Sequence, residues 1–352
     1  MDLLIVNAGS SSLKLRVLSP DDEVLDERSV TDWSGSADAL SELRADAVVH
    51  RVVHGGSRFD GAVLVDDDVE AAIEELVPLA PLHQPRALEL IRASRRDDRP
   101  VVACFDTSYH RTIPAAAATY ALPGEWRDRF GLRKFGFHGL SHEYVARTVE
   151  APRVVSCHLG AGASLCAIED GASVDTTMGF TPVDGLVMAT RSGSVDPGLL
   201  MWLQTAGGLM ADDLADALEH RSGLLGLTGK TEDLQEILAG LDDDTYRLAY
   251  DVYLHRLAGE ITRMAAALGG LDALVFTGGV GERSAAVRAA TCTRLTWLGV
   301  TIDRAANEAG ASVITTSASP VTAYVVPARE DLTMAAQARR LLTRAPGRSG
   351  SR

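Results

Sequence analysis

A single arginine in a long loop is the first residue of this sequence that could do chemistry. Arg191 precedes Ser192-Gly193 in the stretch 175–198, which has neither helical period nor strand alternation and is punctuated by glycine and proline. Its apolar residues favour an ordered, partly buried loop, and loops of this length in compact domains are usually functional or disordered. An arginine there either faces an anionic ligand or pairs with a neighbouring carboxylate, Asp184 or Asp196.

Two more charged residues accompany predicted strands. Arg51 interrupts the apolar run 47–53, just before Gly55-Gly56. A guanidinium inside a strand is costly unless it is paired, so Arg51 either binds a carboxylate or serves a ligand, and the space left by the glycines favours the ligand. Asp106 ends the apolar run 100–106, and open α/β sheets bind ligands at the carboxyl ends of their strands.

A histidine and a glutamate next to predicted helices are further candidates. His138 lies between glycines, before a helix predicted over 143–149 with Ser141 as its N-cap. A lone histidine is usually structural, but the glycines would let a ligand approach closely. Glu330 lies in the first turn of the last predicted helix, where an acid suits the helix dipole. The alternative role for Glu330 is a carboxylate linked to a metal ion.

Three turns rich in small residues have the form of phosphate sites. Each follows a short apolar strand and can present backbone N–H groups, hydroxyls or a helix N-terminus to an anion. Taken alone, the first turn favours an ordinary hairpin with a serine-rich turn, and the GGxG of 278–281 is weak evidence for an anion site. The turns are 8–12, with Lys14 just beyond it, 159–163, and 278–281, which leads into a helix predicted from Glu282.

Length and composition limit the class of protein. A chain of 352 residues with 46% hydrophobic and 5% aromatic residues predicts about two α/β domains. The net charge of −14 argues against binding to nucleic acid or to an anionic membrane, although a site can still be locally positive. The four cysteines have no CxxC spacing, which predicts buried thiols in a reducing compartment. No leader or membrane-spanning run is apparent, so we expect a cytoplasmic protein.

The elements that must position these residues follow a repeated pattern. Strands predicted at 3–7, 13–18 and 23–30 have the same layout as those at 153–158, 164–169 and 172–177. The repeat predicts two similar α/β domains that face one another and grip a polyphosphate with two hairpins. Further strands are predicted at 47–53, 100–106, 272–277, 298–303, 312–315 and 322–326, and further helices at 36–44, 67–77, 85–95, 197–205, 211–220, 232–238, 243–268 and 332–342, with a glycine-rich connector at 222–229.

Motifs in order along nearly the whole chain resemble the acetate kinase family of acyl-phosphate-forming kinases. They include VNAGSSSLK (6–14), HRVVHGG (50–56), FGFHGLSH (135–142), DTTMGFTPVDGL (175–186), TRSGSVDPG (190–198), FTGGVGERS (276–284) and PAREDL (327–332). The resemblance implies duplicated actin-like (ribonuclease H-like) α/β domains with a ligand cleft between them. The implied domains are 1–110 with 332–352, and 111–331, which carries the nucleotide side. It also implies a homodimer that transfers the ATP γ-phosphate to acetate reversibly, with Mg²⁺ or alternatively Mn²⁺.

The resemblance also implies a role for each matched residue. Arg51, Asp106, His138 and Arg191 match the catalytic residues, with His138 and Arg191 as the transition-state stabilisers. Because a carboxylate acceptor is already ionised at pH 7, we expect direct in-line transfer in which Asp106 orients groups without abstracting a proton. The other matches are the metal-linked Asn7 and Glu330, the acyl pocket of Val53, Leu82, Phe137 and Pro182 with Arg51, and the phosphate and nucleotide residues Ser10, Ser12, Lys14, His158, Gly160, Gly162, Asp233, Gly279, Val280 and Arg283.

Three departures from the family pattern fall on the side of the phosphoryl donor. Ala161 replaces the asparagine of HLGNG, Gln235 the usual arginine near the adenine, and Arg283 the asparagine of GENS. Two alternatives to ATP-dependent acetate phosphorylation therefore stay open. One is an acyl kinase that uses propionate, butyrate or another donor such as pyrophosphate. The other is a catalytically weak regulatory protein on the same scaffold, against which the retained charged residues argue.

Overall fold

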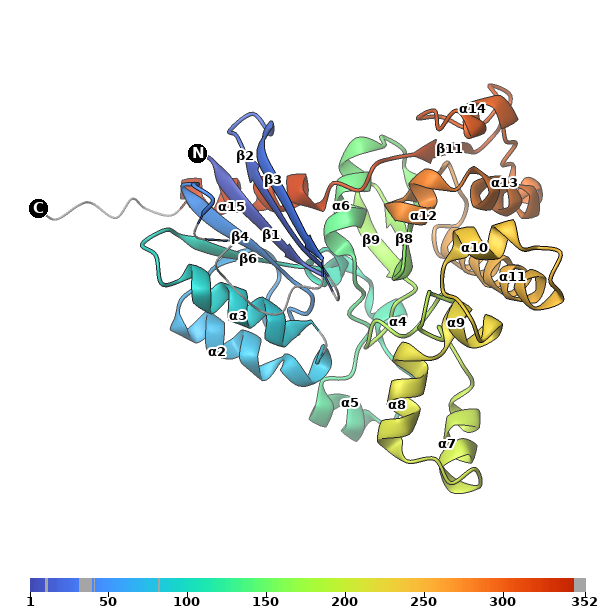
Figure 1. Ribbon diagram of the computed structural model, residues 1–352, viewed down its shortest axis with the longest axis horizontal. Coiled ribbons are helices and arrows are strands. Elements are labelled where there is room, and N and C mark those ends of the chain that lie inside the picture. Colours follow the sequence, from blue (N-terminus) through green and yellow to red (C-terminus); the bar gives the residue numbers. More distant parts are fainter. Residues whose placement is uncertain (10–11, 32–39, 41, 82, 345–352) are drawn as a thin grey trace, which may run out of the picture. The chain divides into compact units, whose positions relative to one another are not determined.

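The computed structural model describes residues 1–9, 12–31, 40, 42–81 and 83–344 (Figure 1). The chain divides into two compact units. Unit 1 comprises Met1–Arg111, Phe137–Tyr144 and Arg329–Arg352, and unit 2 comprises Thr112–Gly136 and Val145–Ala328. The domains predicted from sequence differ from these units mainly in the segment Phe137–Tyr144, which carries His138 and belongs to unit 1.

Unit 1 is built on a six-stranded sheet in the order β3-β2-β1-β4-β6-β5. Strands β1, β2 and β3 are antiparallel neighbours, whereas β1, β4 and β6 run parallel. Alternate side chains of β1 are buried on both faces, Leu3 and Ile5 in one core cluster and Leu4 and Val6 in another. The strands are β1 Leu3–Ala8, β2 Ser12–Leu18, β3 Val24–Thr31, β4 Ala47–Val52, the unpredicted β5 Val63–Leu64, and β6 Val101–Phe105.

Helices cover both faces of the unit 1 sheet. The C-terminal helix α15, Glu330–Arg344, packs Met334, Ala335 and Ala338 against β1, β4 and β6. Helices α2, Asp67–Glu75, and α3, Gln84–Ser94, contribute Ile73, Leu88 and Ile91 to a separate cluster with Val52 and Phe105. The short helices η1 Val77–Leu79 and η2 Ser108–Thr112 complete the described elements, and most of the helix predicted over 36–44 lies outside the described residues.

Unit 2 repeats the strand layout of unit 1 in a five-stranded sheet of order β11-β10-β7-β8-β9. Its first three strands are antiparallel neighbours, and β10 and β11 run parallel to β7. The predicted repeat of two α/β units is therefore confirmed at the level of topology. The strands are β7 Arg153–Leu159, β8 Ala163–Glu169, β9 Ala172–Thr176, β10 Ala273–Thr277 and β11 Thr322–Val325.

The long helix α11, Asp244–Ala267, contacts β7, β8 and β9 and supports the helices beside them. Its buried residues recur at helical spacing, from Ala249 and Tyr253 through Leu257 and Ile261 to Met264. The other helices are α4 Ala115–Ala118, α5 Gly124–Phe130, α6 Gly139–Thr148, α7 Pro197–Thr205, α8 Ala211–His220, α9 Gly223–Thr228, α10 Leu234–Ala239, α12 Gly278–Arg283, α13 Ala285–Arg294, η3 Thr296–Leu298 and α14 Arg304–Glu308. Within the described ranges, no helix is long and apolar enough to cross a membrane.

Several sequence predictions are wrong in detail. Helix α6 begins at Gly139, so Ser141 lies inside it and is not its N-cap. The segment 222–229, predicted as a connector, contains helix α9, and 278–281, predicted as a turn before a helix from Glu282, is already the first part of α12. The predicted strands 298–303 and 312–315 make only isolated bridges between single residues. These errors follow from reading glycine as a helix breaker and short apolar runs as strands, since tertiary contacts override such local preferences.

Candidate active site

The charged centre of unit 1 is an ion pair between Arg51 and Asp106. Arg51 lies in β4 and Asp106 directly follows β6, the neighbouring parallel strand, so both side chains emerge at one edge of the sheet. The Arg51 Nε donates to both carboxylate oxygens at 3.0 Å, and Nη2 donates to Oδ2 at 2.5 Å. Asp106 is only 1% exposed. The predicted pairing of Arg51 with a carboxylate is therefore observed, and its service to a ligand stays a prediction.

Two further predicted residues act on Arg51, one through a hydrogen bond and one through its charge. Its Nη1 donates to Asn7 Oδ1 at 3.0 Å, and the carboxylate of Glu330, in the first turn of α15, is close enough to act on its charge. Burial by itself lowers the pKa of Arg51, but the charge and hydrogen bonds of Asp106, and then the charge of Glu330, raise the pKa above its ordinary value. Arg51 is thus a permanent cation, and the Asp106 carboxylate holds its Nε and Nη2 atoms in place.

The remaining phosphate residues predicted in unit 1 are only partly described. Lys14 lies opposite Asn7 in the antiparallel pair of β1 and β2, and its side chain is exposed. No residue in the described parts of the chain forms an ion pair with the Lys14 ammonium group. Ser12 begins β2, but its side chain is not described, and Ser10 and Leu82 lie outside the described residues.

His138 is held close to Asp106 by the backbone around it. The N–H of Gly139 donates to the Asp106 carbonyl at 2.9 Å, and a Cβ at Gly139 would lie 2.2 Å from that oxygen. Only glycine therefore fits at this position. His138 itself adopts a left-handed conformation with φ of 55° and is half-buried, a backbone state that is uncommon for a non-glycine residue and is enriched at functional sites.

The predicted acyl-pocket residues of unit 1 are buried. Phe137 is 1% exposed and packs its ring edge-to-face with that of His54, while its carbonyl is 3.0 Å from His110 Nε2. Val53 follows β4 and is also buried. Val53 lies two residues after Arg51, and Phe137 directly precedes His138. A site for a small molecule with one charged and one apolar end needs such apolar side chains near its charged residues.

In unit 2, Arg191 lies in the irregular segment 177–196, as predicted. Its Nη1 donates to the Pro182 carbonyl at 3.4 Å, and burial lowers the pKa of the guanidinium, with the charge of Glu219 opposing this. Both predicted partner carboxylates are otherwise engaged. Asp184 accepts from Ser194 Oγ at 2.6 Å, and Asp196 caps α7. Among the described residues no carboxylate pairs with Arg191, so its charge is available to an anion.

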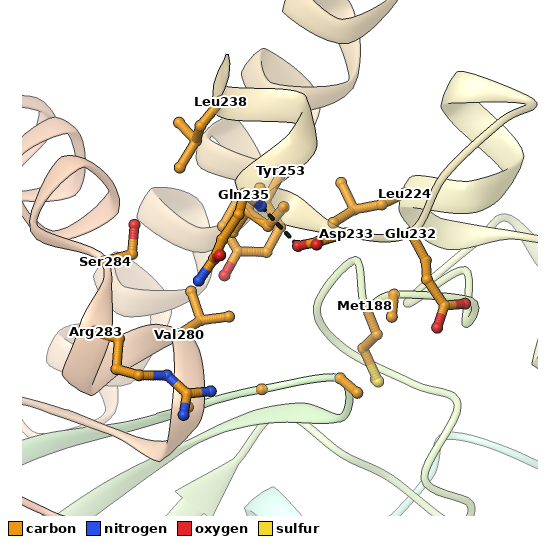
Figure 2. Close-up of a pocket in the computed structure, with 15 residues that line it drawn as sticks. Met188, Leu224, Glu232, Asp233, Gln235, Leu238, Tyr253, Val280, Arg283 and Ser284 are labelled. Carbon is orange, nitrogen blue, oxygen red and sulfur yellow. Dashed lines mark hydrogen bonds between the residues drawn. The ribbon is translucent and has the colours of Figure 1, made fainter. Parts of the chain in front are cut away.

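A cavity of about 290 Å³ in unit 2 gathers five of the seven phosphate and nucleotide residues predicted in that unit (Figure 2). It lies among the β7–β8 turn, the segment before α10, helix α11 and helix α12. The predicted residues that line it are Gly160, Asp233, Gly279, Val280 and Arg283, and the others are Ala161, Met188, Ala189, Leu224, Glu232, Leu234, Gln235, Leu238, Tyr253 and Ser284. His158 and Gly162 are outside this lining, although His158, the penultimate residue of β7, pairs with Thr277, the N-cap of α12.

The three departures from the family pattern converge on this one cavity. Ala161, Gln235 and Arg283 come from three different elements, and all three line it. Figure 2 shows the Gln235 and Arg283 side chains extending toward the same space from α10 and α12, with Val280 between them. Arg283 is exposed and forms no ion pair with any described carboxylate. An apolar wall with a few polar groups at its rim suits a flat aromatic ring with polar substituents.

A buried arginine supports the helix on which Arg283 lies. Arg288 is 1% exposed, and its Nη1 donates to the carbonyls of Gly281 and Glu282 at the end of α12. Its Nε and Nη2 bind the side chain and carbonyl of Asn307. Sequence analysis missed this residue, and it also missed the apolar cavity residues Met188, Leu224, Leu234, Leu238 and Tyr253, whose sequence signal is the same as that of core positions.

The oxygen atoms beside Arg51 fit a magnesium ion. Mg²⁺ usually keeps several water ligands and takes only one or two protein carboxylates. The described residues include no cluster of three His, Cys, Asp or Glu side chains that could hold a metal ion. Glu330 forms no hydrogen bond or ion pair within the described structure, and Asn7 Oδ1 retains a second lone pair beside its bond from Arg51. Both groups are hard oxygen donors, as Mg²⁺ prefers.

Comparisons with known proteins give one consistent result. The model of the acetokinase family matches residues 34–336. An acetate kinase from Trichormus variabilis is 44% identical over 319 residues, covering 87% of this chain and 78% of the relative. Two solved structures match 97% of this chain and 99% of their own, with a TM-score of 0.89 and 34% identity. They are an acetate kinase from Porphyromonas gingivalis and a propionate kinase from Francisella tularensis.

Proposed function

The chain belongs to the acetokinase family, and from that premise we propose that it transfers the γ-phosphoryl group of ATP to acetate, giving acetyl phosphate and ADP. The observation that carries the proposal is the cluster around Arg51. The Arg51 guanidinium is fixed by Asp106, donates a hydrogen bond to Asn7 and is under the electrostatic influence of Glu330. A fixed cation with an amide oxygen and a carboxylate in its surroundings can bind an anion together with a metal ion.

The chemistry needs charge neutralisation more than proton transfer. An acetate oxygen forms the new bond to the γ-phosphorus while the bond from that phosphorus to the β–γ bridging oxygen breaks, and ADP leaves. Both reactants are anions, so Arg51, Arg191 and His138 act by offsetting the charge of the phosphoryl oxygens. Because acetate is already ionised at pH 7, Asp106 has no proton to remove. Its two oxygens instead bind Arg51 and orient that cation.

Asn7 and Glu330 are the residues that would hold Mg²⁺, either directly or through its water ligands. When bound, the ion supplies further positive charge for the phosphates of the donor. Arg51 donates a hydrogen bond to Asn7, and the charge of Glu330 at the start of α15 acts on it, so the cation is coupled to both proposed metal ligands.

For the acceptor, we propose that Val53, Leu82, Phe137 and Pro182 contact the methyl group of acetate. Val53 and Phe137 are buried and apolar, and the carbonyl of Pro182 accepts a hydrogen bond from Arg191 in the same loop. One additional methylene changes binding in such a pocket by only about 1–3 kcal/mol. Propionate is therefore the nearest alternative acceptor, and butyrate the next.

For the identity of the phosphoryl donor, a specific observation favours a second candidate. Ala161, Gln235 and Arg283, which depart from the family pattern, all line the cavity of unit 2, so another nucleotide or pyrophosphate could replace ATP. The apolar wall of Val280, Leu234 and Leu238 favours a donor that carries a base, since pyrophosphate has nothing to bury there. We therefore place ATP first.

We also propose that the protein is a cytoplasmic homodimer. All four cysteines are buried free thiols. Burial raises the pKa of Cys166 to about 12 and the pKa of Cys292 to about 12. Such thiols are unreactive structural groups, and they suit a reducing compartment, where disulfides are rare.

The test is trapping of the acyl phosphate with hydroxylamine. Purified protein, Mg²⁺ and acetate would be combined with ATP, GTP and pyrophosphate in parallel, and ATP would be repeated with propionate and butyrate. We expect hydroxamate with ATP and acetate. Product with pyrophosphate alone would show that the unit 2 cavity serves another donor. No product with any combination would favour a regulatory protein on the same scaffold, and an isolated phosphorylated enzyme on the reaction path would overturn direct transfer.

A further inference from the structure

Tyr120 binds the loop formed by residues 179–184, which we call the Pro182 loop after its central proline. Tyr120 lies between α4 and α5 in unit 2 and is half-buried. Its hydroxyl oxygen accepts a hydrogen bond from the N–H of Phe180 at 2.7 Å. Burial, and then the charge of Asp184, raise the pKa of this phenol to about 12. The hydroxyl is therefore neutral at physiological pH, and its bond to the loop is stable there.

Gly179 lets the tyrosine hydroxyl approach the loop closely. A Cβ at this position would lie 2.3 Å from the Tyr120 hydroxyl oxygen and 2.6 Å from Asp184 Oδ2, so a side chain there would displace both groups. The Gly179 carbonyl also accepts hydrogen bonds from the N–H groups of Phe135 and Gly136, at 3.1 and 3.2 Å. Three segments of unit 2 thus meet at this one glycine, and Tyr120 belongs to one of them.

The Pro182 loop is held at both ends. Near its start, the Tyr120 hydroxyl binds Phe180, and at its end Asp184 accepts a hydrogen bond from Ser194 Oγ at 2.6 Å. Pro182 lies between these two points and, as a proline, has no N–H group that could bond elsewhere. The position of Pro182 therefore depends on how its neighbours in the loop are held.

A hollow of about 330 Å³ lies against the same loop. It is separate from the cavity that gathers the nucleotide residues, because the two share no lining residue. Its volume is far above the roughly 10–15 Å³ that a single water molecule needs, so a loop released from its anchor has space to shift into it. The residues that line the hollow are Tyr120, Leu122, Leu132, Phe180, Thr181 and Asp184.

We propose that Tyr120 sets the length of the acyl chain that the protein accepts, by holding the Pro182 loop out of this hollow. The inference rests on the proposed function, in which Pro182 contacts the methyl group of acetate. With the tyrosine bond in place, the loop is fixed and a short acyl chain fits best. Without the bond, the loop shifts toward the hollow and leaves room for a longer chain. Tyr120 is thus a positioning residue that acts through Pro182 and does not touch the substrate.

The first experiment compares two acceptors. Tyr120→Phe removes the hydroxyl and keeps the ring, so the kcat/KM for propionate relative to that for acetate should rise about three- to tenfold, the scale of one net hydrogen bond. Tyr246→Phe is the matched control, because Tyr246 of the same unit also uses its hydroxyl in a hydrogen bond, to Glu236 at 2.9 Å. It should keep the wild-type ratio. A general loss of stability would lower both values alike and leave the ratio fixed.

A second substitution tests the part played by the hollow. Leu132→Phe adds a larger side chain to its lining, so combining it with Tyr120→Phe should restore the preference for acetate. Leu132→Phe alone should keep the wild-type ratio. An unchanged ratio in Tyr120→Phe would overturn the proposal, and a double variant with the raised ratio would show that the loop does not shift into the hollow.

The third measurement does not depend on activity. Hydrogen exchange of the Phe180 amide, resolved by NMR, should be about tenfold faster in Tyr120→Phe than in the wild type and unchanged in Tyr246→Phe. Equal exchange in all three proteins would show that the hydroxyl does not hold the loop. If the wild type forms no acyl phosphate, the proposed function fails, whereas the exchange rates still decide whether Tyr120 fixes the loop. Circular dichroism and melting of each variant confirm that it is folded.

Discussion

The two units share a strand layout but hold their candidate active-site arginines in different ways. In unit 1, Arg51 is bound by both oxygens of a buried carboxylate and by Asn7. In unit 2, Arg191 and Arg283 form no ion pair with any carboxylate in the described ranges, and backbone hydrogen bonds hold the loop around Arg191. The same topology therefore supports an arginine that is neutralised by a carboxylate of the protein, Arg51, and arginines whose charge remains available to an anion, Arg191 and Arg283.

This difference separates positioning from charge supply. A guanidinium that is already paired with Asp106 has less positive charge to offer an incoming phosphoryl group, but its position is fixed before the substrate arrives. An unpaired guanidinium that is partly buried, such as Arg191, offers its full charge and gains most when an anion binds. We infer that unit 1 contributes mainly orientation and unit 2 mainly charge, and substitutions in each unit can separate the two.

The largest effect should come from removing the unpaired cation. Arg191→Ala should lower kcat by about two to four orders of magnitude, the scale for losing a charge contact made in the transition state. Its free energy of unfolding should change little, because Arg191 leaves no buried carboxylate unpaired. Steady-state kinetics of acyl-phosphate formation and urea unfolding give the two values.

Two controls accompany this variant. Arg191→Lys should recover part of the rate, since it keeps the charge but loses the planar fork of the guanidinium. Arg294→Ala removes an exposed arginine that pairs with Asp251 and is distant in sequence from Arg191. It should leave kcat unchanged. Near-normal turnover of Arg191→Ala would remove this residue from the mechanism.

Breaking the paired cation should change stability as well as rate. Asp106→Asn leaves Arg51 buried without its carboxylate, so the free energy of unfolding should fall by about 3 kcal/mol. The matched control is Asp272→Asn, which breaks a similar arginine–aspartate pair with Arg153 at the surface. That change should matter much less, because solvent screens the pair. Equal losses in urea unfolding would contradict the distinction drawn between the two units.

Much of this fold follows from local sequence patterns. Apolar runs ending in small-residue turns predicted both hairpins, and the two sheets have the repeated order that the pattern indicates. The glycine-rich segment 278–281 was predicted as a loop, yet it is helical in α12. Its last carbonyls accept hydrogen bonds from Arg288, a residue of the next helix. Such a contact cannot be read from the glycines themselves.

The site was less predictable from local patterns than the fold. Arg51, Asp106 and Arg191 were recognisable as charged residues in apolar surroundings, but whether each had a carboxylate partner depended on strands and loops distant in sequence. That Ala161, Gln235 and Arg283 line one cavity could not be seen either, because they lie on a turn and two helices separated by many residues. Because the three residues line the same cavity, the choice of phosphoryl donor depends on this one cavity.

A smaller effect concerns acid stability, which should arise in unit 1. His50 precedes Arg51 in β4, is fully buried and lies 2.9 Å from Ser94 Oγ, and burial lowers its pKa to about 3. The unfolded chain takes up a proton near pH 6.5 while folded His50 does not. Its contribution to stability is therefore complete above about pH 6.5 and is lost as the pH falls toward 3, by about 2 kcal/mol between pH 7 and 5.

The corresponding strand of unit 2, β10, contains no titratable side chain. His50→Gln should therefore flatten the dependence of the urea midpoint on pH between 7 and 5, and Thr277→Val, at the end of β10, should leave it as steep as in the wild type. If the midpoint of His50→Gln falls with acid as steeply as that of the wild type, the acid sensitivity arises elsewhere.

The smallest predicted effect belongs to the other unpaired cation, Arg283. This guanidinium is exposed, so it competes with water for any contact and is expected to contribute at most about 1.4 kcal/mol to binding, a factor of ten. Arg283→Asn, which restores the residue of the family pattern, should raise the KM for ATP by three- to tenfold (on the scale of one exposed charge-assisted hydrogen bond) and leave kcat and the KM for acetate unchanged.

Gln235→Ala in the same cavity serves as the comparison, since it removes a neutral amide. An unchanged KM for ATP would show that Arg283 does not contact the donor, whereas a lower KM would show that it obstructs the nucleotide. In that second case the unpaired cations of unit 2 would have opposite effects, with Arg191 promoting transfer and Arg283 restricting which donors enter.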